Sequence, residues 1–155
     1  EGQHAHVPGG EPLGVVVLYL PVQPPGLVIE HLFDEEFVMV SGQRASGRRS
    51  SSDYVFIDWG PDFSNDHAAA FPKLANPGLN LDIGPFALDY VLETGASGYF
   101  PARLVQRHLA RGKLRRPARA RKFVYPVYMV YPEARDEEAF EPILAGLRAH
   151  AEKFV

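Results

Sequence analysis

Cysteine is absent from this sequence, and long apolar runs are absent as well. Without cysteine there are no disulfide bonds, no thiol catalysis and no zinc sites built on Cys ligands. No apolar stretch reaches the length of a membrane-spanning helix, and the N-terminus lacks a basic-then-apolar signal pattern. We therefore expect a soluble cytoplasmic protein with no membrane partner, although a mature secreted protein would also lack its signal.

Recognisable catalytic and nucleotide-binding motifs are also missing. The sequence has no P-loop and no Gly-x-Gly-x-x-Gly. The stretch ETGASGYFP at 93–101 resembles a damaged nucleophile elbow, but Tyr99 stands where the second glycine of Gly-x-Ser-x-Gly should be. Ser97 is therefore a poor candidate for a nucleophile, and we expect no enzyme.

The sequence contains no complete metal-binding motif either. Asp58, Asp62 and Asp66 are regularly spaced, but the glycine and the closing glutamate of an EF-hand are absent. His4 and His6 are the only clustered histidines, and they lie in a polar segment where a surface loop or a tag-like remnant is the simpler interpretation. We expect no metal and no cofactor.

What is present suits a folded protein. The chain has 155 residues, 46% of them hydrophobic, and 18 aromatic side chains (10 Phe, 7 Tyr and 1 Trp). This length fits one compact domain or two small lobes, and the composition supplies a buried core. Residues 1–12 are polar, contain Pro and Gly, and give no folding signal.

Charge is unevenly distributed. Residues 1–102 hold 4 Lys/Arg against 13 Asp/Glu, whereas residues 103–155 hold 12 against 6. Arg103–Lys122 contains nine basic residues and no acid. Such a run is found at phosphate-binding surfaces, but it is also found as a solvated face that complements an acidic surface. Both interpretations remain open.

Strand and helix patterns alternate along the chain. Apolar and alternating runs predict strands, of which the Val-rich first one should be buried on both faces. Helices are predicted where 3.6-residue periodicity or Ala-rich segments follow, the first with Ser64 or Asn65 as its N-cap. The strands fall at 13–21, 27–42, 53–60, 78–83, 97–100 and 122–132, and the helices follow Ser64 or Asn65 up to residue 71 and fall at 84–95, 101–112 and 136–155. This order favours an α/β fold with a largely parallel sheet.

Proline and glycine predict several element ends. Pro85 suits the first turn of its helix and Gly95 suits its C-cap. Pro126 interrupts the last strand, which indicates an edge or a bend. Pro142 means that the final helix either starts near Glu141 or kinks there.

One helix start is a candidate ligand site. In parallel α/β sheets, ligands bind beyond the carboxyl ends of the strands. The free N–H groups of the Pro85–Leu88 turn would favour an anion such as a carboxylate, but a helix start without any ligand is an equally open interpretation. Tyr99 and Phe100 are either walls of a pocket or a pair of core aromatics.

The order of these motifs resembles the effector-binding domain of LysR-type transcriptional regulators. The resemblance covers about residues 13–155, and its most specific stretches are LFDEEFVMVSG and the pattern Gly-x-Ser-Gly-Tyr-Phe-Pro followed by Leu-x-x-Gly-x-Leu. It implies a periplasmic-binding-protein-like (type 2) fold, in which two crossover segments join two α/β lobes with a ligand cleft between them.

The resemblance also implies a domain plan and a ligand site. The first lobe would be 13–36 plus 132–155 and incomplete, the second lobe 42–124, and the crossovers 37–41 and 125–131, after a poorly defined segment 1–12. Asp58 and Trp59 carry over less well from the family than the other cleft residues. Those other cleft residues are Tyr19, Pro21, Ser41, Gly42, Pro85, Phe86, Gly98 and Tyr99.

The implied function is that of a ligand-sensing regulatory domain. It would bind a small organic, anionic effector and alter the geometry of a homo-oligomer, a dimer or tetramer in the full-length form, to control transcription. Operator DNA would be bound only through an N-terminal domain. This chain would lack that domain and also the start of the first lobe. The alternative is a solute-binding protein of a transport system with the same lobes.

Overall fold

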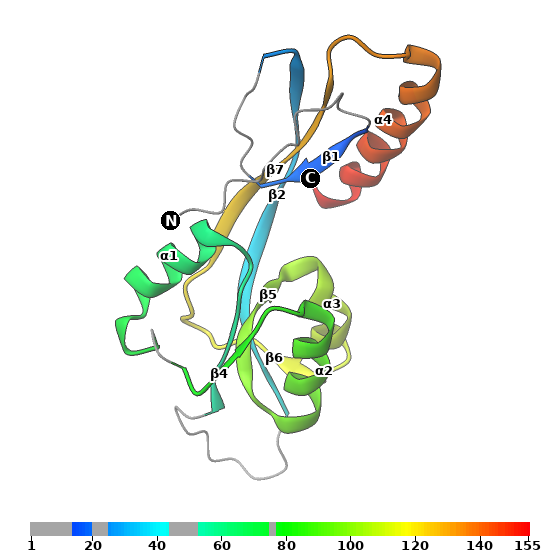
Figure 1. Cartoon of the computed structure of the whole chain (residues 1–155). Helices are drawn as coiled ribbons and strands as arrows, with labels where there is room; N and C mark the ends of the chain where they lie inside the picture. Colours follow the sequence, from blue (N-terminus) through cyan, green and yellow to red (C-terminus); the bar gives the residue numbers. More distant parts are fainter. Residues whose placement is uncertain (1–13, 20–24, 44–52, 75–76) are drawn as a thin grey trace. The chain divides into compact units, whose positions relative to one another are not determined.

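A computed structural model of the protein describes residues 14–19, 25–43, 53–74 and 77–155 (Figure 1). The predicted site residue Pro21, the His4 and His6 pair, and the loop 44–52 lie outside these residues. The chain divides into two compact units: unit 1 comprises residues 1–35 and 125–155, and unit 2 comprises residues 36–124. No helix in the described residues is long and apolar enough to cross a membrane.

Unit 1 begins with a short strand. β1 (Val16–Leu18) pairs antiparallel with β7 (Phe123–Pro132), and Val16 lies opposite Val130. Val16 and Val17 are 54% and 48% exposed, so the prediction of a strand over 13–21 buried on both faces is wrong. A Val-rich run predicts burial only when something covers both faces, and β1 is the last strand at its end of the described sheet.

The main helix of unit 1 is α4 (Glu137–Ala151), which continues into a 3-10 turn, η3 (Glu152–Phe154). The Asp136 carboxylate caps it by accepting from the backbone N–H groups of Glu138 and Ala139. Of the two alternatives for Pro142, the start of the helix near Glu141 is wrong, because the cap starts the helix earlier and Pro142 lies inside it; the kink stays a prediction. A core of Met129, Tyr131 and Leu144 holds α4 against the strands.

Unit 2 contains antiparallel and parallel pairing. β2 (Leu27–Gly42) pairs antiparallel with β5 (Ser97–Pro101) and with β6 (Leu114–Arg115). β3 (Val55–Ile57) and β4 (Leu79–Leu81) are parallel. The strand order of the larger sheet is β1-β7-β2-β5, with β6 beside β2. The prediction of a largely parallel sheet is wrong, because β2 and β7 contribute residues to both units and their pairing does not follow the strand–helix alternation.

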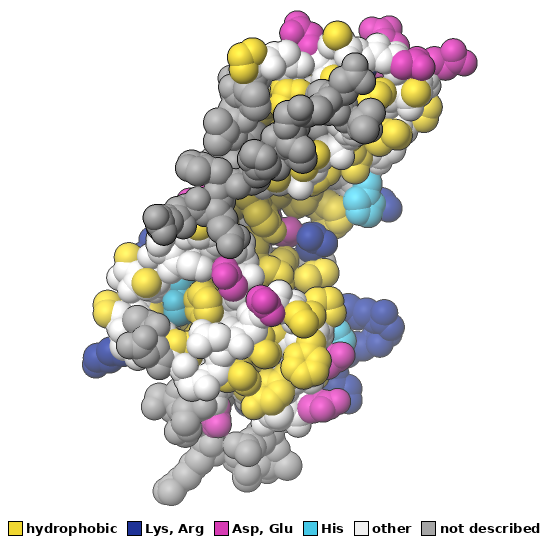
Figure 2. All heavy atoms as spheres, viewed as in Figure 1, with side chains coloured by type: hydrophobic (Ala, Val, Ile, Leu, Met, Phe, Trp, Pro, Cys, Tyr) yellow, Lys and Arg dark blue, Asp and Glu magenta, His cyan; other side chains and the backbone are white. Residues whose placement is uncertain are grey.

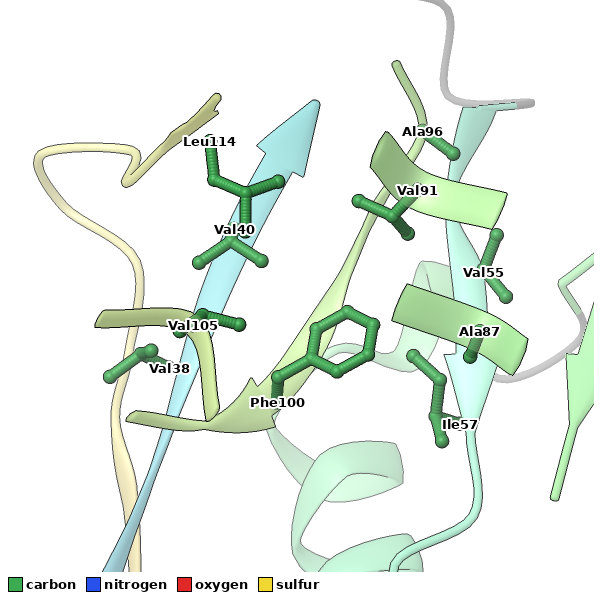
Figure 3. Close-up of a cluster of buried hydrophobic side chains, with 10 residues drawn as sticks. All are labelled: Val38, Val40, Val55, Ile57, Ala87, Val91, Ala96, Phe100, Val105 and Leu114. Carbon is green, nitrogen blue, oxygen red and sulfur yellow. The ribbon is translucent and has the colours of Figure 1, made fainter. Parts of the chain in front are cut away.

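Helices cover both faces of the sheet in unit 2 (Figure 1). On one face lie α1 (Pro61–Ala70) and a 3-10 turn, η2 (Pro72–Leu74); on the other lie α2 (Gly84–Thr94) and α3 (Ala102–Ala110). Alternate residues of a strand point to opposite faces, so Val38 and Val40 join the core under α2 and α3 (Figure 3). Phe37, one residue before Val38 and so on the opposite face, contacts Phe63 of α1 instead.

Two local signals from proline and glycine are confirmed, both at the ends of α2. Gly95 caps α2 with a left-handed φ of 78°, and Pro85 lies in its first turn. The N-cap of α1 is Gly60, followed by Pro61, so the prediction of Ser64 or Asn65 is wrong; Pro is pre-organised for the first helical position and starts the helix earlier. β7 passes through Pro126 without interruption, so that prediction is wrong too.

Candidate functional site

β3 and β4 end at the same edge of unit 2, and a helix begins after each. Ile57 lies opposite Leu81, and the Asp58 N–H donates to the Leu81 carbonyl at 2.9 Å. Because the two strands are parallel, the first turns of α1 and α2 lie at this common edge, where α/β proteins place ligands. We call residues 58–64 and 82–86 the carboxyl edge.

A hydrogen-bonded turn forms the α1 side of the carboxyl edge. Asp58 Oδ1 accepts from the Gly60 N–H at 2.9 Å and from Ser64 Oγ at 3.1 Å. Gly60 has a φ of 112°, which L side chains rarely adopt, so the turn requires glycine there. Asp58 therefore shapes the backbone that leads into α1.

Trp59, on the α1 side of the carboxyl edge, contacts both the sheet and the start of α2. Its Nε1–H donates to the Tyr99 carbonyl of β5 at 2.8 Å. Its ring covers Gly84, where an added Cβ would lie 2.7 Å from the Trp59 Cη2 atom. Ring contacts with Phe37 and Phe100, at 5.6 and 6.0 Å between centroids, complete its packing. The start of α2 is thus fixed by the single tryptophan of the chain.

The first turn of α2 combines unused donors with exposed apolar side chains. Its N-cap, Ile83, makes no side-chain cap, and its first turn holds no acid. The Gly84 and Phe86 N–H groups have no partner within the helix by its geometry, and they carry the positive end of the helix dipole. Ile83 and Phe86 are 60% and 59% exposed, and Figure 2 shows hydrophobic side chains exposed on this unit. This surface suits a molecule with an anionic group and an apolar part.

The predicted site residues do not gather at one place in unit 2. Pro85 and Phe86 lie at the start of α2, whereas Gly42 packs at its other end, where an added Cβ would lie 2.8 Å from the Gly95 Cα. Eleven helical residues separate these ends by about 16 Å. Ser41, beside Gly42, is fully buried and its Oγ has no hydrogen-bond partner.

Gly98 and Tyr99 lie in the protein core. An added Cβ at Gly98 would lie 2.7 Å from Ile57 Cδ1 and 3.1 Å from the Val55 carbonyl oxygen, so this glycine lets β5 approach β3 closely. The Tyr99 side chain is fully buried and its hydroxyl donates to the Arg121 carbonyl at 2.7 Å. Burial raises the pKa of Tyr99 to about 12, although the nearby Arg121 charge opposes the shift.

Phe100 is fully buried as well, and it packs in the cluster under α2 and α3 (Figure 3). Of the two interpretations of this aromatic pair, the structure therefore places both rings in the core. The one polar group of the pair that reaches the carboxyl edge is the backbone carbonyl of Tyr99, through Trp59.

The remaining predicted residues lie in unit 1 or outside the described chain. Tyr19 follows β1, is half-buried, and its ring lies edge-on to that of Tyr125 with 6.5 Å between centroids. Pro21 is not among the described residues. In the described part of the chain, no group of three or more His, Cys, Asp or Glu is arranged to hold a metal ion.

Two features of the carboxyl edge were not found by the analysis of the sequence. One is the link from Asp58 to Ser64, and the other is the contact between Trp59 and Gly84. A signal for the first existed in Gly60-Pro61, since a glycine before a helix-opening proline marks a tight strand-to-helix turn. No signal for the second is visible, because Trp59 and Gly84 are distant in sequence.

The basic stretch Arg103–Lys122 runs from α3 through β6 to the start of β7. Arg116 and Lys122 pair with Glu36, at 3.7 and 3.0 Å. The Arg121 guanidinium lies 5.3 Å from the centroid of the Phe123 ring. Lys and Arg side chains are visible over α3 in Figure 2. The stretch is therefore partly paired within unit 2 and otherwise exposed.

Comparison with known proteins gives a family match. Residues 13–152 match the family described as LysR substrate binding domain. The chain is similar in structure to the apo regulatory domain of HypT from Salmonella typhimurium, with a TM-score of 0.71 and 12% identity, covering 90% of this chain and 73% of that one. A comparison with curated proteins found no match.

Two longer solved proteins show the same likeness. DarR from Vibrio fischeri, solved in complex with DNA, has a TM-score of 0.69 at 14% identity over 86% of this chain and 50% of that one. Full-length LysG from Corynebacterium glutamicum, with bound effector Arg, has a TM-score of 0.65 at 10% identity over 88% and 50%. This chain thus spans about half of each of these proteins. Together with the family match, the likeness confirms the α/β, periplasmic-binding-protein-like fold.

Proposed function

This chain belongs to the LysR substrate-binding domain family, and from that premise we propose that it senses a small organic anion at the carboxyl edge of unit 2. Domains of this family are regulatory, ligand-sensing parts of transcription factors and are not enzymes. The family does not fix the ligand. The regulatory domain of HypT has been solved with a bromide ion, and LysG with arginine as effector. The charge of the effector must therefore be inferred from the residues of this chain.

The first turn of α2 carries the proposal. The N–H groups of this turn have no partner within the helix and, with the helix dipole, favour a carboxylate; the turn itself contains no acidic side chain, whereas Asp58, Asp62 and Asp82 lie elsewhere on the carboxyl edge. Ile83 and Phe86, both more than half exposed beside those donors, would pack against the apolar part of the ligand. Trp59 holds the turn in place from below. The cleft between two lobes, with Tyr19 and Pro21 on its other side, stays a prediction.

Intrinsic fluorescence provides the test, because Trp59 is the only tryptophan and it touches the proposed site. A panel of small carboxylic acids, each paired with its amide, is titrated into the protein. We expect a saturable change in Trp59 emission with at least one apolar carboxylate and none with its neutral amide. Equal responses to the acid and to the amide would contradict an anionic ligand. The absence of any saturable response across the panel would contradict a binding site at the carboxyl edge.

A pair of variants at Phe86 separates charge from contact. Phe86→Ser removes the exposed ring, whereas Phe86→Asp also puts a negative charge in the first turn of α2. We expect Phe86→Asp to bind the carboxylate about tenfold more weakly than Phe86→Ser does, which is about 1.4 kcal/mol. Both side chains replace an exposed one, so the fold should be retained. Equal affinities of the two variants would contradict an anion at this turn.

The regulatory part of the proposal concerns the full-length protein. We infer that ligand binding changes the arrangement of a homo-oligomer and so controls transcription, with operator DNA bound by a separate N-terminal domain. A winged helix-turn-helix encoded upstream in the same gene would support this role. An export signal upstream would instead support the transport-type solute-binding protein.

A further inference from the structure

Two side chains attach α1 to unit 2. Of the ten residues of this helix, only Phe63 and His67 are buried. Ala68 and Ala69 face outward, and no side chain caps the first turn. A helix of this length is marginal by itself, so its place on the sheet depends on these two anchors. One of the two is a titratable group.

His67 lies in a cluster of aromatic rings. Its side chain is 2% exposed. The rings around it come from β3 and the residue before it, from α1 and the residue after it, and from β5. Their centroids lie 5.0 to 5.9 Å from that of the imidazole: Tyr54, Phe56, Phe63, Phe71 and Tyr99. Such an environment has no water to solvate an imidazolium. Burial accordingly lowers the pKa of His67 below its usual 6.5.

One hydrogen bond ties His67 to the sheet. Tyr54 Oη and His67 Nε2 are 2.6 Å apart and buried. Burial raises the pKa of Tyr54, so its hydroxyl keeps its proton and donates it. We assign His67 Nε2 as the bare nitrogen of a neutral imidazole, which accepts this bond. A proton on Nε2 would turn this acceptor into a donor, so that the Tyr54 hydroxyl would have to reorient, and it would place a charge among the buried rings.

We propose that the Tyr54–His67 pair is an acid-sensitive latch, which holds α1 on the sheet at neutral pH and releases it when His67 takes up a proton. α1 begins in the Asp58–Ser64 turn of the carboxyl edge, so its release would loosen that side of the ligand surface. This last link rests on the proposed function. The latch itself does not, because the release of α1 can be measured without any ligand.

The other ionisable groups near His67 do not neutralise an imidazolium. Tyr54 lies directly before β3 and Tyr99 lies in β5, and burial raises the pKa of both. From β7, Phe123 packs against Phe63, and the guanidinium that lies over Phe123 is that of Arg121. On α1 itself and on η2, the charged neighbours Asp66 and Lys73 are exposed. In the part of the chain that the structure describes, desolvation is the cause that shifts His67, and no carboxylate counters it.

The pH window follows from the direction of the shift. In the unfolded chain His67 takes up a proton near its usual 6.5, whereas the folded state binds it only at lower pH. The folded state therefore has its full stability above about pH 6.5 and loses it as pH falls from there toward the lowered pKa. Local opening of α1 should follow the same window, because it exposes His67 to water.

Hydrogen exchange of the α1 amides is the experiment. At pH 7.5 and at pH 5.5, protection factors are measured for α1, α2 and α3, corrected for intrinsic exchange. We expect the protection of α1 to fall more than that of α2 or α3 between the two pH values, by several-fold and up to about tenfold, which is the limit for one group with an open-state pKa of 6.5. A wild-type α1 that keeps its protection at pH 5.5 would overturn the latch.

Three variants isolate the pair. The double variant Tyr54→Phe, His67→Phe replaces both polar groups with rings of similar shape and should fold, because no buried donor or acceptor is left alone. Its α1 should be protected equally at both pH values. Tyr54→Phe alone leaves the neutral His67 without its hydroxyl partner, so α1 should be less protected than in wild type at pH 7.5 and its further loss of protection at pH 5.5 should be smaller. The matched control His108→Gln, on α3, should respond to acid as wild type does.

The outcomes separate the latch from ligand sensing. An acid response of α1 that persists in the double variant, or that disappears in His108→Gln, would overturn the latch whatever the protein binds. Where a carboxylate does bind, its affinity should fall at pH 5.5 in wild type and not in the double variant. If no ligand binds, the proposed function is contradicted, but the hydrogen-exchange result still tests the latch.

Discussion

The two units of this chain hold their helices in opposite ways. Unit 1 carries 3 Lys/Arg against 11 Asp/Glu, a balance of −8, and unit 2 carries 13 against 8, a balance of +5. In unit 1, α4 is tied to β2 by a partly exposed ion pair. In unit 2, α1 is tied to the sheet by buried rings and one neutral histidine. α4 also packs on the core of Met129, Tyr131 and Leu144, so unit 1 adds a surface ion pair to apolar burial, whereas α1 is held by buried rings and one histidine.

The ion-pair anchor of unit 1 has good geometry. Arg148 donates from Nε to Glu30 Oε1 at 2.7 Å and from Nη2 to Glu30 Oε2 at 2.9 Å. The Tyr131 hydroxyl adds a third bond to Glu30 at 3.1 Å. Acidic side chains gather around the start of α4 (Figure 2), where they favour the positive end of its dipole. This anchor depends on charge, so it should respond to salt and to strong acid.

The aromatic anchor of unit 2 depends on area and shape. Phe63 is 2% exposed and its ring lies 5.4 to 5.8 Å from those of Phe37, Phe123, His67 and Tyr99. Contacts of this kind are insensitive to salt but sensitive to any loss of volume. We therefore expect α4 to respond to salt and to strong acid, and α1 to respond to a loss of side-chain volume. A perturbation that affects the other helix instead would contradict this comparison.

The largest effect should come from Phe63→Ala. Removing a fully buried ring leaves a cavity and takes away one of the two anchors of α1, at a cost of about 3 to 5 kcal/mol in the free energy of unfolding. Urea unfolding followed by Trp59 fluorescence measures it. The control Phe86→Ala removes the same atoms from an exposed site and should change the free energy of unfolding by less than about 0.5 kcal/mol. Similar costs for the two variants would contradict the anchor.

How far the sequence anticipates this anchor differs from residue to residue. Gly95 and Pro85 were predicted at their helix ends because their backbone preferences act locally and the structure confirms both. The motif order was sufficient for the family and the fold. The role of His67 was not foreseen, because a histidine on a helix gives no sign of the rings that surround it. Those rings come from strands and loops before and after α1.

The candidate site was harder to predict than the fold. A motif gives the order of residues along the chain but no distance between them, so Gly42 and Pro85 were grouped although they lie at opposite ends of α2. The Val-rich start of the chain was expected to be buried, yet Val16 and Val17 are exposed. Burial depends on what packs against a strand, and the sequence of the strand alone does not contain that information.

Two glycine-to-alanine substitutions should change the free energy of unfolding by intermediate amounts, with opposite signs in the two units. Gly98→Ala in unit 2 would place its Cβ 2.7 Å from Ile57 Cδ1 and 3.1 Å from the Val55 carbonyl, which should cost about 1 to 3 kcal/mol. Gly146→Ala in α4 meets nothing within 4 Å and should stabilise unit 1 by about 0.5 to 1 kcal/mol. Urea unfolding of both variants checks the signs. Stabilisation by Gly98→Ala would show that β5 and β3 are less closely packed than described.

The smallest and most condition-dependent effect should come from Glu30→Gln. The Arg148 guanidinium holds the pKa of Glu30 below its usual 4.5, so the pair stabilises unit 1 above about pH 4.5 and loses this contribution as pH falls through the lowered pKa. The variant should therefore be less stable than wild type at pH 7 and low salt. The difference should shrink in high salt and at pH 3.

The control for this pair is Glu133→Gln, an exposed acid that makes no side-chain bond among the described contacts. It removes the same charge without touching Arg148 and should leave unfolding at pH 7 unchanged. Protection of α4 should survive at pH 5.5, where the Tyr54–His67 latch has begun to open and Glu30 is still ionised. If α4 instead loses protection together with α1 between pH 7.5 and pH 5.5, the two anchors are not independent, and the contrast between charge and aromatic burial fails.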